Sequence, residues 1–142
     1  MKKVKLIALA YLVLTTFASN AQNNSMKEIE TTITEFAKAA DNSDAEKLGT
    51  YLDDNYRIVM NRLFGSNEVS VLTKDLYLSK IESKEFGGDK REGSIESITI
   101  NGSTANAKVR MIGTKMTFVS LLSLVQDAAG NWKLISDTPI TE

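Results

Sequence analysis

The sequence of 142 residues contains no histidine and no cysteine. Their absence removes the usual protein ligands of zinc, copper and haem, so we expect no metal and no cofactor. It also excludes Ser-His-Asp and Cys-His nucleophile systems, and no disulfide can form. Long runs of basic residues are missing as well. Most familiar catalytic and metal-binding arrangements are therefore closed to this chain.

The first 21 residues have the pattern of a secretory signal peptide. Lys2, Lys3 and Lys5 form a charged start, and an apolar run from Leu6 to Phe17 is short for a membrane span. Ser19-Asn20-Ala21 supplies small residues before a cleavage point after Ala21. We expect a signal peptide over 1–21, a single domain over 22–142, and export to the periplasm or the medium. An uncleaved anchor helix is the alternative.

Cleavage at this point changes the charge balance. Removing three lysines from the 17 basic residues leaves 14 against 18 acidic residues, a net charge of −4. Nucleic-acid binding depends on neutralising phosphates with basic residues, so we expect no nucleic-acid partner. No second apolar segment approaches the length of a membrane span, so none is expected after cleavage.

The last third of the chain reads as four consecutive antiparallel strands. Apolar and polar residues alternate, and turn residues separate the segments at short intervals. Asn101-Gly102 predicts a type I′ turn between the first two strands. The predicted strands are Ser94–Asn101, Thr104–Ile112, Met116–Gln126 and Asn131–Asp137.

Helical patterns occupy most of the chain before this meander. Capping boxes at Ser25 and Ser43 predict the starts of two helices, and Thr73 predicts the cap of a third over 74–85. Tyr56–Leu63 reads as an isolated strand between the second and third helices. We therefore predict the α+β class: three N-terminal helices packed on a curved antiparallel sheet that ends in a four-strand meander.

Short motifs in this order resemble the nuclear transport factor 2-like superfamily with its cystatin-like cone, and within it the putative lumazine-binding, SnoaL-like subgroup. The residues that carry the resemblance are Asp41-x-x-Asp44-Ala45-x-x-Leu48, Ala105-x-Ala107-Lys108-Val109, Phe118-x-x-x-Leu122-x-Leu124 and Gly130-Asn131-Trp132-Lys133-Leu134-Ile135. Two positions depart from the pattern of relatives. Ser120 stands where they often carry an acidic residue, and Asp137 where they often carry a basic one.

The resemblance implies a pocket at the open end of a cone. Alternation places Phe118, Ser120, Leu122 and Leu124 on the face toward the helices. The candidate ligand-binding residues are Tyr56, Phe118, Ser120, Leu122 and Trp132. Trp132 is alternatively an ordinary core residue, as strand tryptophans usually are.

The candidates for catalysis lie near the first strand and in the meander. A carboxylate beside a tyrosine could abstract a proton next to a carbonyl, and an arginine could bind an anionic group. The candidate residues are Asp53, Asp54, Tyr56, Arg62 and Arg110. The alternatives are a solvated turn for the two aspartates and surface salt bridges for the two arginines.

The outer face of Met116–Gln126 is also apolar, with Val119 and Leu121 exposed to a partner by the alternation. We therefore expect a homodimer through the outer sheet face, or else a central strand under a loop. Three functions remain open. The favoured one is an exported, non-catalytic pocket protein that binds a small, mostly apolar molecule. The others are an isomerase or hydratase of the same fold and a dimerising interaction module.

Overall fold

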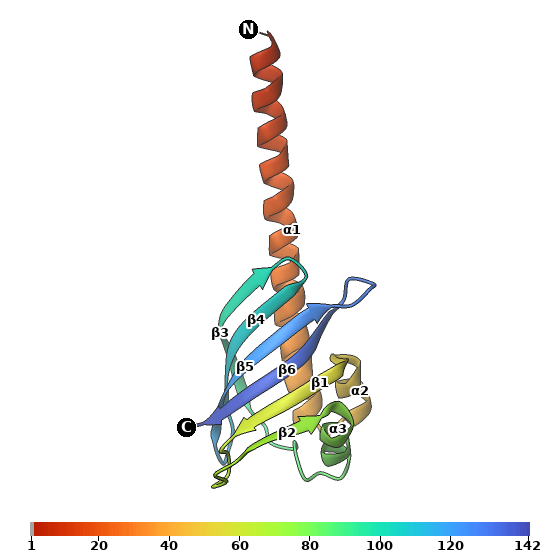
Figure 1. Cartoon of the computed structure of the whole chain (residues 1–142), viewed down its shortest axis with the longest axis vertical. Helices are drawn as coiled ribbons and strands as arrows, with labels where there is room; N and C mark the ends of the chain where they lie inside the picture. The colour runs from red at the N-terminus through yellow and green to blue at the C-terminus, as the bar shows by residue number, and fades with distance from the viewer. Residues whose placement is uncertain (1) are drawn as a thin grey trace.

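Alternating apolar residues build a six-stranded sheet that curves around one long helix, in the computed structural model of this protein (Figure 1). The structure describes residues 2–142, with side chains from Gln22 onward. The signal peptide predicted over 1–21 lies outside the residues whose side chains are described. The elements are α1 (Lys2–Asp41), α2 (Ala45–Thr50), β1 (Leu52–Asn61), β2 (Val69–Thr73), α3 (Lys74–Glu82), β3 (Glu92–Asn101), β4 (Thr104–Ile112), β5 (Thr117–Gln126) and β6 (Trp132–Thr141).

The strands are arranged in the order β2-β1-β6-β5-β4-β3, and β3 to β6 pair antiparallel in chain order. The α+β class is as predicted, but the sheet differs in two ways. A short edge strand, β2, pairs with β1 and was not predicted. In addition, β1 runs parallel to β6, so the sheet is mixed rather than wholly antiparallel. The last strand of the chain thus lies in the middle of the sheet.

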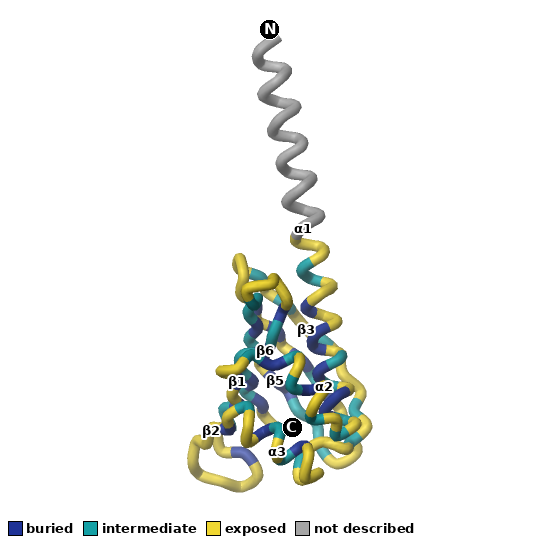
Figure 2. Tube along the Cα trace, turned by 90° about the vertical axis from the view of Figure 1, so that its right-hand side faces the viewer, coloured by how far each residue is buried: buried dark blue, intermediate teal, exposed yellow. Residues whose placement is uncertain are grey.

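Helix α1 packs its apolar stripe into the concave side of the sheet. Ile29, Ile33, Phe36 and Ala40 are each at most 2% exposed, and Ala37 packs at the edge of the same core. Their spacing of three and four residues keeps them on one face of the helix. In Figure 2 the buried positions of α1 and of the strands face one another. The helix therefore closes the core along one side of the cone.

The helix ends differ from the predicted capping boxes. Helix α1 continues through Ser25 without a break. Asp44, not Ser43, caps α2, and its carboxylate accepts from the Lys47 amide at 2.9 Å. Thr73 caps α3 as expected, but that helix ends at Glu82. A single N-cap residue stabilises a helix by about 1 kcal/mol, so two neighbouring residues that can both cap a helix differ little in free energy.

The β3–β4 turn also differs from its prediction. Gly102 has a φ of +59°, whereas Asn101 is absent from the residues with positive φ among those described. Asn101 pairs with Thr104 in register, so Gly102 and Ser103 are the central residues of the turn. Positive φ at the first central residue alone is the pattern of a type II′ turn rather than type I′.

A bulge in β6 decides which side chains face the interior. Leu134 pairs with Leu124 and Ser136 with Ser123, so Ile135 is an extra residue in the ladder. One extra residue shifts the alternation, and it turns Asp137 and Pro139 onto the buried side. The pairing of β6 with β1 ends at Asp137, so the missing amide hydrogen of Pro139 leaves no hydrogen bond to β1 unmade. Strand β6 therefore continues through Pro139, beyond the predicted end of the strand at Asp137.

The outer face of β5 is covered unevenly. Val119 is only 4% exposed within the single chain, whereas Leu121 is 57% exposed. Arg110 pairs in register with Val119 and forms salt bridges with Glu96 and Glu142. Leu121 is thus the exposed member of the predicted contact, and the homodimer stays a prediction.

Candidate functional site

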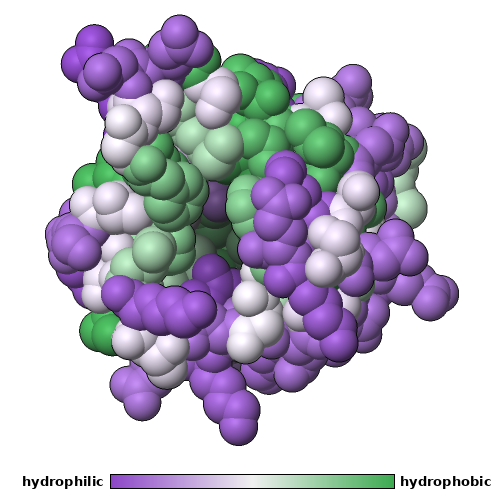
Figure 3. All heavy atoms as spheres, turned by 90° about the horizontal axis from the view of Figure 1, so that it is seen from below, coloured by the Kyte–Doolittle hydropathy of each residue, from purple (hydrophilic) through white to green (hydrophobic). Residues whose placement is uncertain are grey.

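A pocket of about 520 Å³ opens at the end of the cone, between the sheet and the ends of α1 and α3. Volumes of 300–1,000 Å³ are typical of small-molecule sites. Figure 3 looks at this end of the molecule and shows a hollow bordered by hydrophobic residues on one side and hydrophilic residues on the other. The strands supply its floor, and three loops around Leu63, Gly87 and Lys115 form its mouth.

Most of the pocket wall is apolar. Ile58 and Met60 come from β1, and Phe118 from β5. The Phe64 ring meets the edge of the Phe118 ring at 6.4 Å between centroids, although Phe64 is 62% exposed at the mouth. Aromatic side chains of this kind favour an apolar or aromatic ligand, because a ligand ring can displace water and pack against them.

Ser120 and Asp137 form a polar pair in this wall, on adjacent strands. They are 1% and 7% exposed, and the Ser120 hydroxyl donates a hydrogen bond to the Asp137 carboxylate. Burial raises the pKa of Asp137 from 3.8 to about 7, against the opposing effects of Ser120 and Arg91. Asp137 Oδ1 has no hydrogen-bond partner among the described residues. A ligand that offered a hydrogen bond here would satisfy a buried polar atom.

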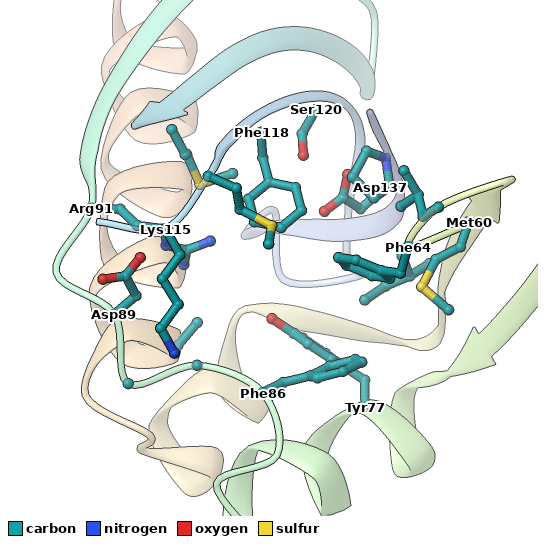
Figure 4. Close-up of a pocket in the computed structure, with 18 of the residues that line it drawn as sticks. Met60, Phe64, Tyr77, Phe86, Asp89, Arg91, Lys115, Phe118, Ser120 and Asp137 are labelled. Carbon is teal, nitrogen blue, oxygen red and sulfur yellow. The ribbon is translucent and has the colours of Figure 1, made fainter. Parts of the chain in front are cut away.

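Charged residues surround the opposite side of the pocket. Arg91 forms a salt bridge with Asp41 of α1, with 2.5 Å between Nε and Oδ1. Asp89 accepts hydrogen bonds from the amide and the hydroxyl of Thr114, and these bonds lower its pKa. Figure 4 shows Asp89, Arg91 and Lys115 on the side of the pocket away from Ser120 and Asp137.

Two tyrosines lie close to the Asp137 carboxylate. Tyr77 lines the pocket, and its ring packs against that of Tyr56 at 5.8 Å. Burial first, and the charge of Asp137 second, raise the pKa of both hydroxyls above their ordinary value. Both therefore stay protonated near neutral pH and serve as hydrogen-bond donors rather than bases. The Tyr56 hydroxyl has no partner among the described residues.

The structure brings together only part of the predicted ligand-binding set. Phe118 and Ser120 line the pocket. Tyr56 and Leu122, each 1% exposed, belong to the core cluster and are not among the residues that line the pocket. Trp132 lies beside a separate groove formed by α1 and the β5–β6 hairpin, and it also belongs to the core cluster.

The predicted catalytic residues other than Tyr56 lie away from the pocket. Asp53 accepts from the Asn55 amide at 2.9 Å in a local turn, and the Asp54 side chain is 99% exposed beside Lys74. Arg62 is exposed just after β1 with a φ of +54°, and Arg110 is on the outer face. The Asp–Arg arrangement considered from the sequence is therefore not assembled inside the cone.

Asp137 and Arg91 are two charged residues of the pocket that were not among the predicted site residues. One signal was available: the resemblance marked Ser120 and Asp137 as the two expected departures from the family pattern, and the two side chains interact across adjacent strands. No pattern in the sequence marked Arg91, because its place depends on the contact of its loop with Asp41, fifty residues earlier.

Metal and membrane features are absent from the part of the chain with described side chains. Within it, no group of three His, Cys, Asp or Glu residues could hold a metal ion. Within the same range, no helix is long and apolar enough to cross a membrane. The side chains of the pocket themselves offer apolar walls and, at Asp137, a group that can exchange a proton or a hydrogen bond.

Comparison with known proteins gives a family match and a consistent fold. The family described as putative lumazine-binding matches residues 24–138. The search of curated proteins found no match. An NTF2-like protein of unknown function from Silicibacter pomeroyi superposes with a TM-score of 0.74 at 15% identity, over 85% of this chain and 98% of that one.

Two further structures have the same fold. An NTF2-like protein from Cytophaga hutchinsonii has a TM-score of 0.68 at 21% identity, covering 80% of this chain and 95% of its own. A protein described as a putative scytalone dehydratase, from Novosphingobium aromaticivorans, has a TM-score of 0.66 at 18% identity, covering 87% and 88%. At these identities the likeness shows the fold alone.

Proposed function

Because the chain belongs to the putative lumazine-binding family of NTF2-like proteins, we propose that its pocket binds a small, mostly apolar molecule. One observation carries the proposal: an open, largely apolar hollow of about 520 Å³ contains the buried, unpartnered oxygen of Asp137. A buried polar atom without a partner costs about 1–3 kcal/mol, and a bound hydrogen-bonding group would recover part of that cost. The proposal keeps the export predicted from residues 1–21.

Filling the pocket should abolish binding. Met60 is half-buried and lines the hollow (Figure 4), so Met60→Trp would place an indole in the space a ligand needs. We expect the affinity for the neutral dye prodan, whose carbonyl can accept a hydrogen bond, to fall at least about tenfold in a fluorescence titration, or about 1.4 kcal/mol.

The matched control is Ile112→Trp, which adds the same side chain at a 50% exposed position outside the pocket. It should bind prodan as the unchanged protein does. Equal binding by all three proteins would contradict a site in the cone. Native mass spectrometry of the unchanged protein would additionally identify any molecule retained from the cell.

A second candidate function is proton transfer on a bound substrate. The observation that favours it is the pKa of Asp137, which burial raises to about 7, where a carboxyl group can both accept and donate a proton near neutral pH. One similar structure is described as a putative scytalone dehydratase, which makes this chemistry worth testing on the same fold. Turnover that disappears in Asp137→Asn while binding persists would favour the enzyme over the binding protein.

The homodimer remains part of the proposal. Leu121 is 57% exposed on the outer face of β5, so Leu121→Arg would place a charge in the expected apolar contact. Sedimentation velocity should show a dimer for the unchanged chain and a monomer for this variant. Val69→Arg, at a 60% exposed position on the edge strand β2, should stay dimeric. A monomeric unchanged chain would rule out the contact.

A further inference from the structure

An arginine at the side of the pocket is fixed in place but only partly used. The Asp41 carboxylate accepts from Arg91 Nε at 2.5 Å and from the Arg91 backbone amide at 3.2 Å. The two side chains are only 17% and 16% exposed. Both terminal nitrogens, Nη1 and Nη2, make no hydrogen bond within the described part of the chain. The guanidinium therefore presents two donor groups whose orientation is already set.

The acidic groups on the Arg91 side of the pocket are all engaged, whereas the terminal nitrogens of Arg91 and the ammonium group of Lys115 are not, among the residues described. Asp41 pairs with Arg91, Asp89 accepts from Thr114, and Glu85 forms a salt bridge with Lys80 at 2.6 Å. Lys115 lines the mouth and has no salt bridge or hydrogen bond to the side chains described here. Donors for an anion are thus available on this side, and acceptors for a cation are mostly occupied.

Apolar surface separates these donors from the buried polar pair. In Figure 4 the Phe118 ring lies between Arg91 on one side and Ser120 with Asp137 on the other. A ligand that filled the hollow would therefore meet charged donors at one end, aromatic walls in the middle and a hydrogen-bonding pair at the far end.

We infer that the ligand is an apolar molecule carrying a carboxylate, which the terminal nitrogens of Arg91 bind as a bidentate pair. Lys115 assists at the mouth, and a neutral hydroxyl or carbonyl of the ligand reaches Ser120 and Asp137. This inference rests on the proposed function and names its ligand class. A planar guanidinium with its Nε already held matches a carboxylate well, because little freedom is lost on binding.

Three probes of similar shape test this at pH 6 with the full chain: 2-naphthoate, the neutral 2-naphthamide, and 2-naphthylmethylamine. Calorimetric titration should show that 2-naphthoate binds at least about tenfold more tightly than the amide, as expected for a charge-assisted bidentate pair. The amine should bind most weakly, because burial disfavours the ionised form of Asp137, while Asp89 and Glu85 already have partners in Thr114 and Lys80.

Variants then assign the preference to Arg91. Arg91→Gln should bring the affinities for naphthoate and the amide together, and Arg91→Lys should keep only part of the difference. Arg110→Gln is the matched control, because it removes the same charge from the outer face. Lys115→Gln should weaken the binding of 2-naphthoate a few-fold. This variant keeps the salt bridge between Arg91 and Asp41, so it tests the inference even if Arg91→Gln does not fold.

The outcomes separate the inference from the proposed function. Equal binding of naphthoate and the amide, or tighter binding of the amine, would overturn the carboxylate class while a binding pocket remained. A carboxylate preference that survived in Arg91→Gln would overturn the role of Arg91. Binding of no probe, together with no retained molecule in native mass spectrometry, would overturn the proposed function itself.

Discussion

Replacing Asp137 by asparagine should stabilise the protein at pH 8 by up to about 4 kcal/mol and change its stability little at pH 4. The value follows from the pKa of this buried carboxyl, which rises from 3.8 to about 7, at about 1.4 kcal/mol for each factor of ten. At pH 8 the folded protein must keep an ionised carboxylate away from water, which asparagine avoids. Urea denaturation of both proteins at pH 4, 6 and 8 measures the difference.

The sign follows from proton binding. In the unfolded chain Asp137 releases its proton near pH 3.8, whereas the folded protein holds it to about pH 7. Between these values the folded state binds more protons, so this group stabilises the fold at low pH and the stabilisation is lost as the pH rises. The groups that face Asp137 are Ser120, Arg91, Tyr56 and Tyr77, and the two tyrosines stay neutral over this range.

Asp89→Asn provides the control of opposite sign. Hydrogen bonds from Thr114 lower the pKa of Asp89, so its ionised form is favoured in the folded protein. Removing that charge should weaken the fold at pH 8 rather than strengthen it. A stability difference between Asp137→Asn and the unchanged protein that stayed constant from pH 4 to pH 8 would show that the pKa of Asp137 is not raised.

Gly87→Ala should destabilise the protein by about 3–5 kcal/mol, the largest loss expected from one methyl group. Gly87 has a φ of +80°, which costs a residue with a side chain about 1–2 kcal/mol. A Cβ there would also lie 2.3 Å from the carbonyl oxygen of Ala40 in α1. Backbone cannot rotate out of the way as a side chain can, so the loop at the pocket mouth must move, which costs further free energy.

Gly65→Ala separates the two causes. Gly65 has almost the same φ, +81°, but a Cβ at that position would meet nothing within 4 Å. It should therefore lose only about 1–2 kcal/mol in the same denaturation experiment. Equal losses in the two variants would show that the approach to Ala40 is not constrained. Because Gly87 lines the pocket, its alanine variant should also bind prodan more weakly.

The parts of the fold predicted well from the sequence are those with strong local patterns. The bounds of β4 match the prediction, because Ala107, Val109 and Met111 alternate with polar residues and are all buried. The family resemblance is confirmed over residues 24–138. Strand β2 was not predicted from the sequence pattern. It is a five-residue edge strand with four exposed positions, so its sequence carries no alternation of buried and exposed residues.

The site depended on tertiary features that no short window contains. Phe118 and Ser120 were found because β5 pairs with β4 without a register shift, so the two-residue period holds along the strand. The orientation of Asp137 results from the bulge at Ile135, and a one-residue shift reverses every later side chain of a strand. The position of Arg91 is set by its partner Asp41, and the two are brought together only when the loop after α3 packs against the end of α1.

The place of β6 between β1 and β5 has a consequence for how the protein is made. Until residues 132–141 have been synthesised, β1 and β2 have no strand to join them to β3, β4 and β5. Helices and hairpins can therefore form early, but the sheet that supports the pocket closes only when β6 joins its two halves. Closing the sheet is expected to be slow compared with forming the hairpins, since the pairing of β1 with β6 joins segments about eighty residues apart.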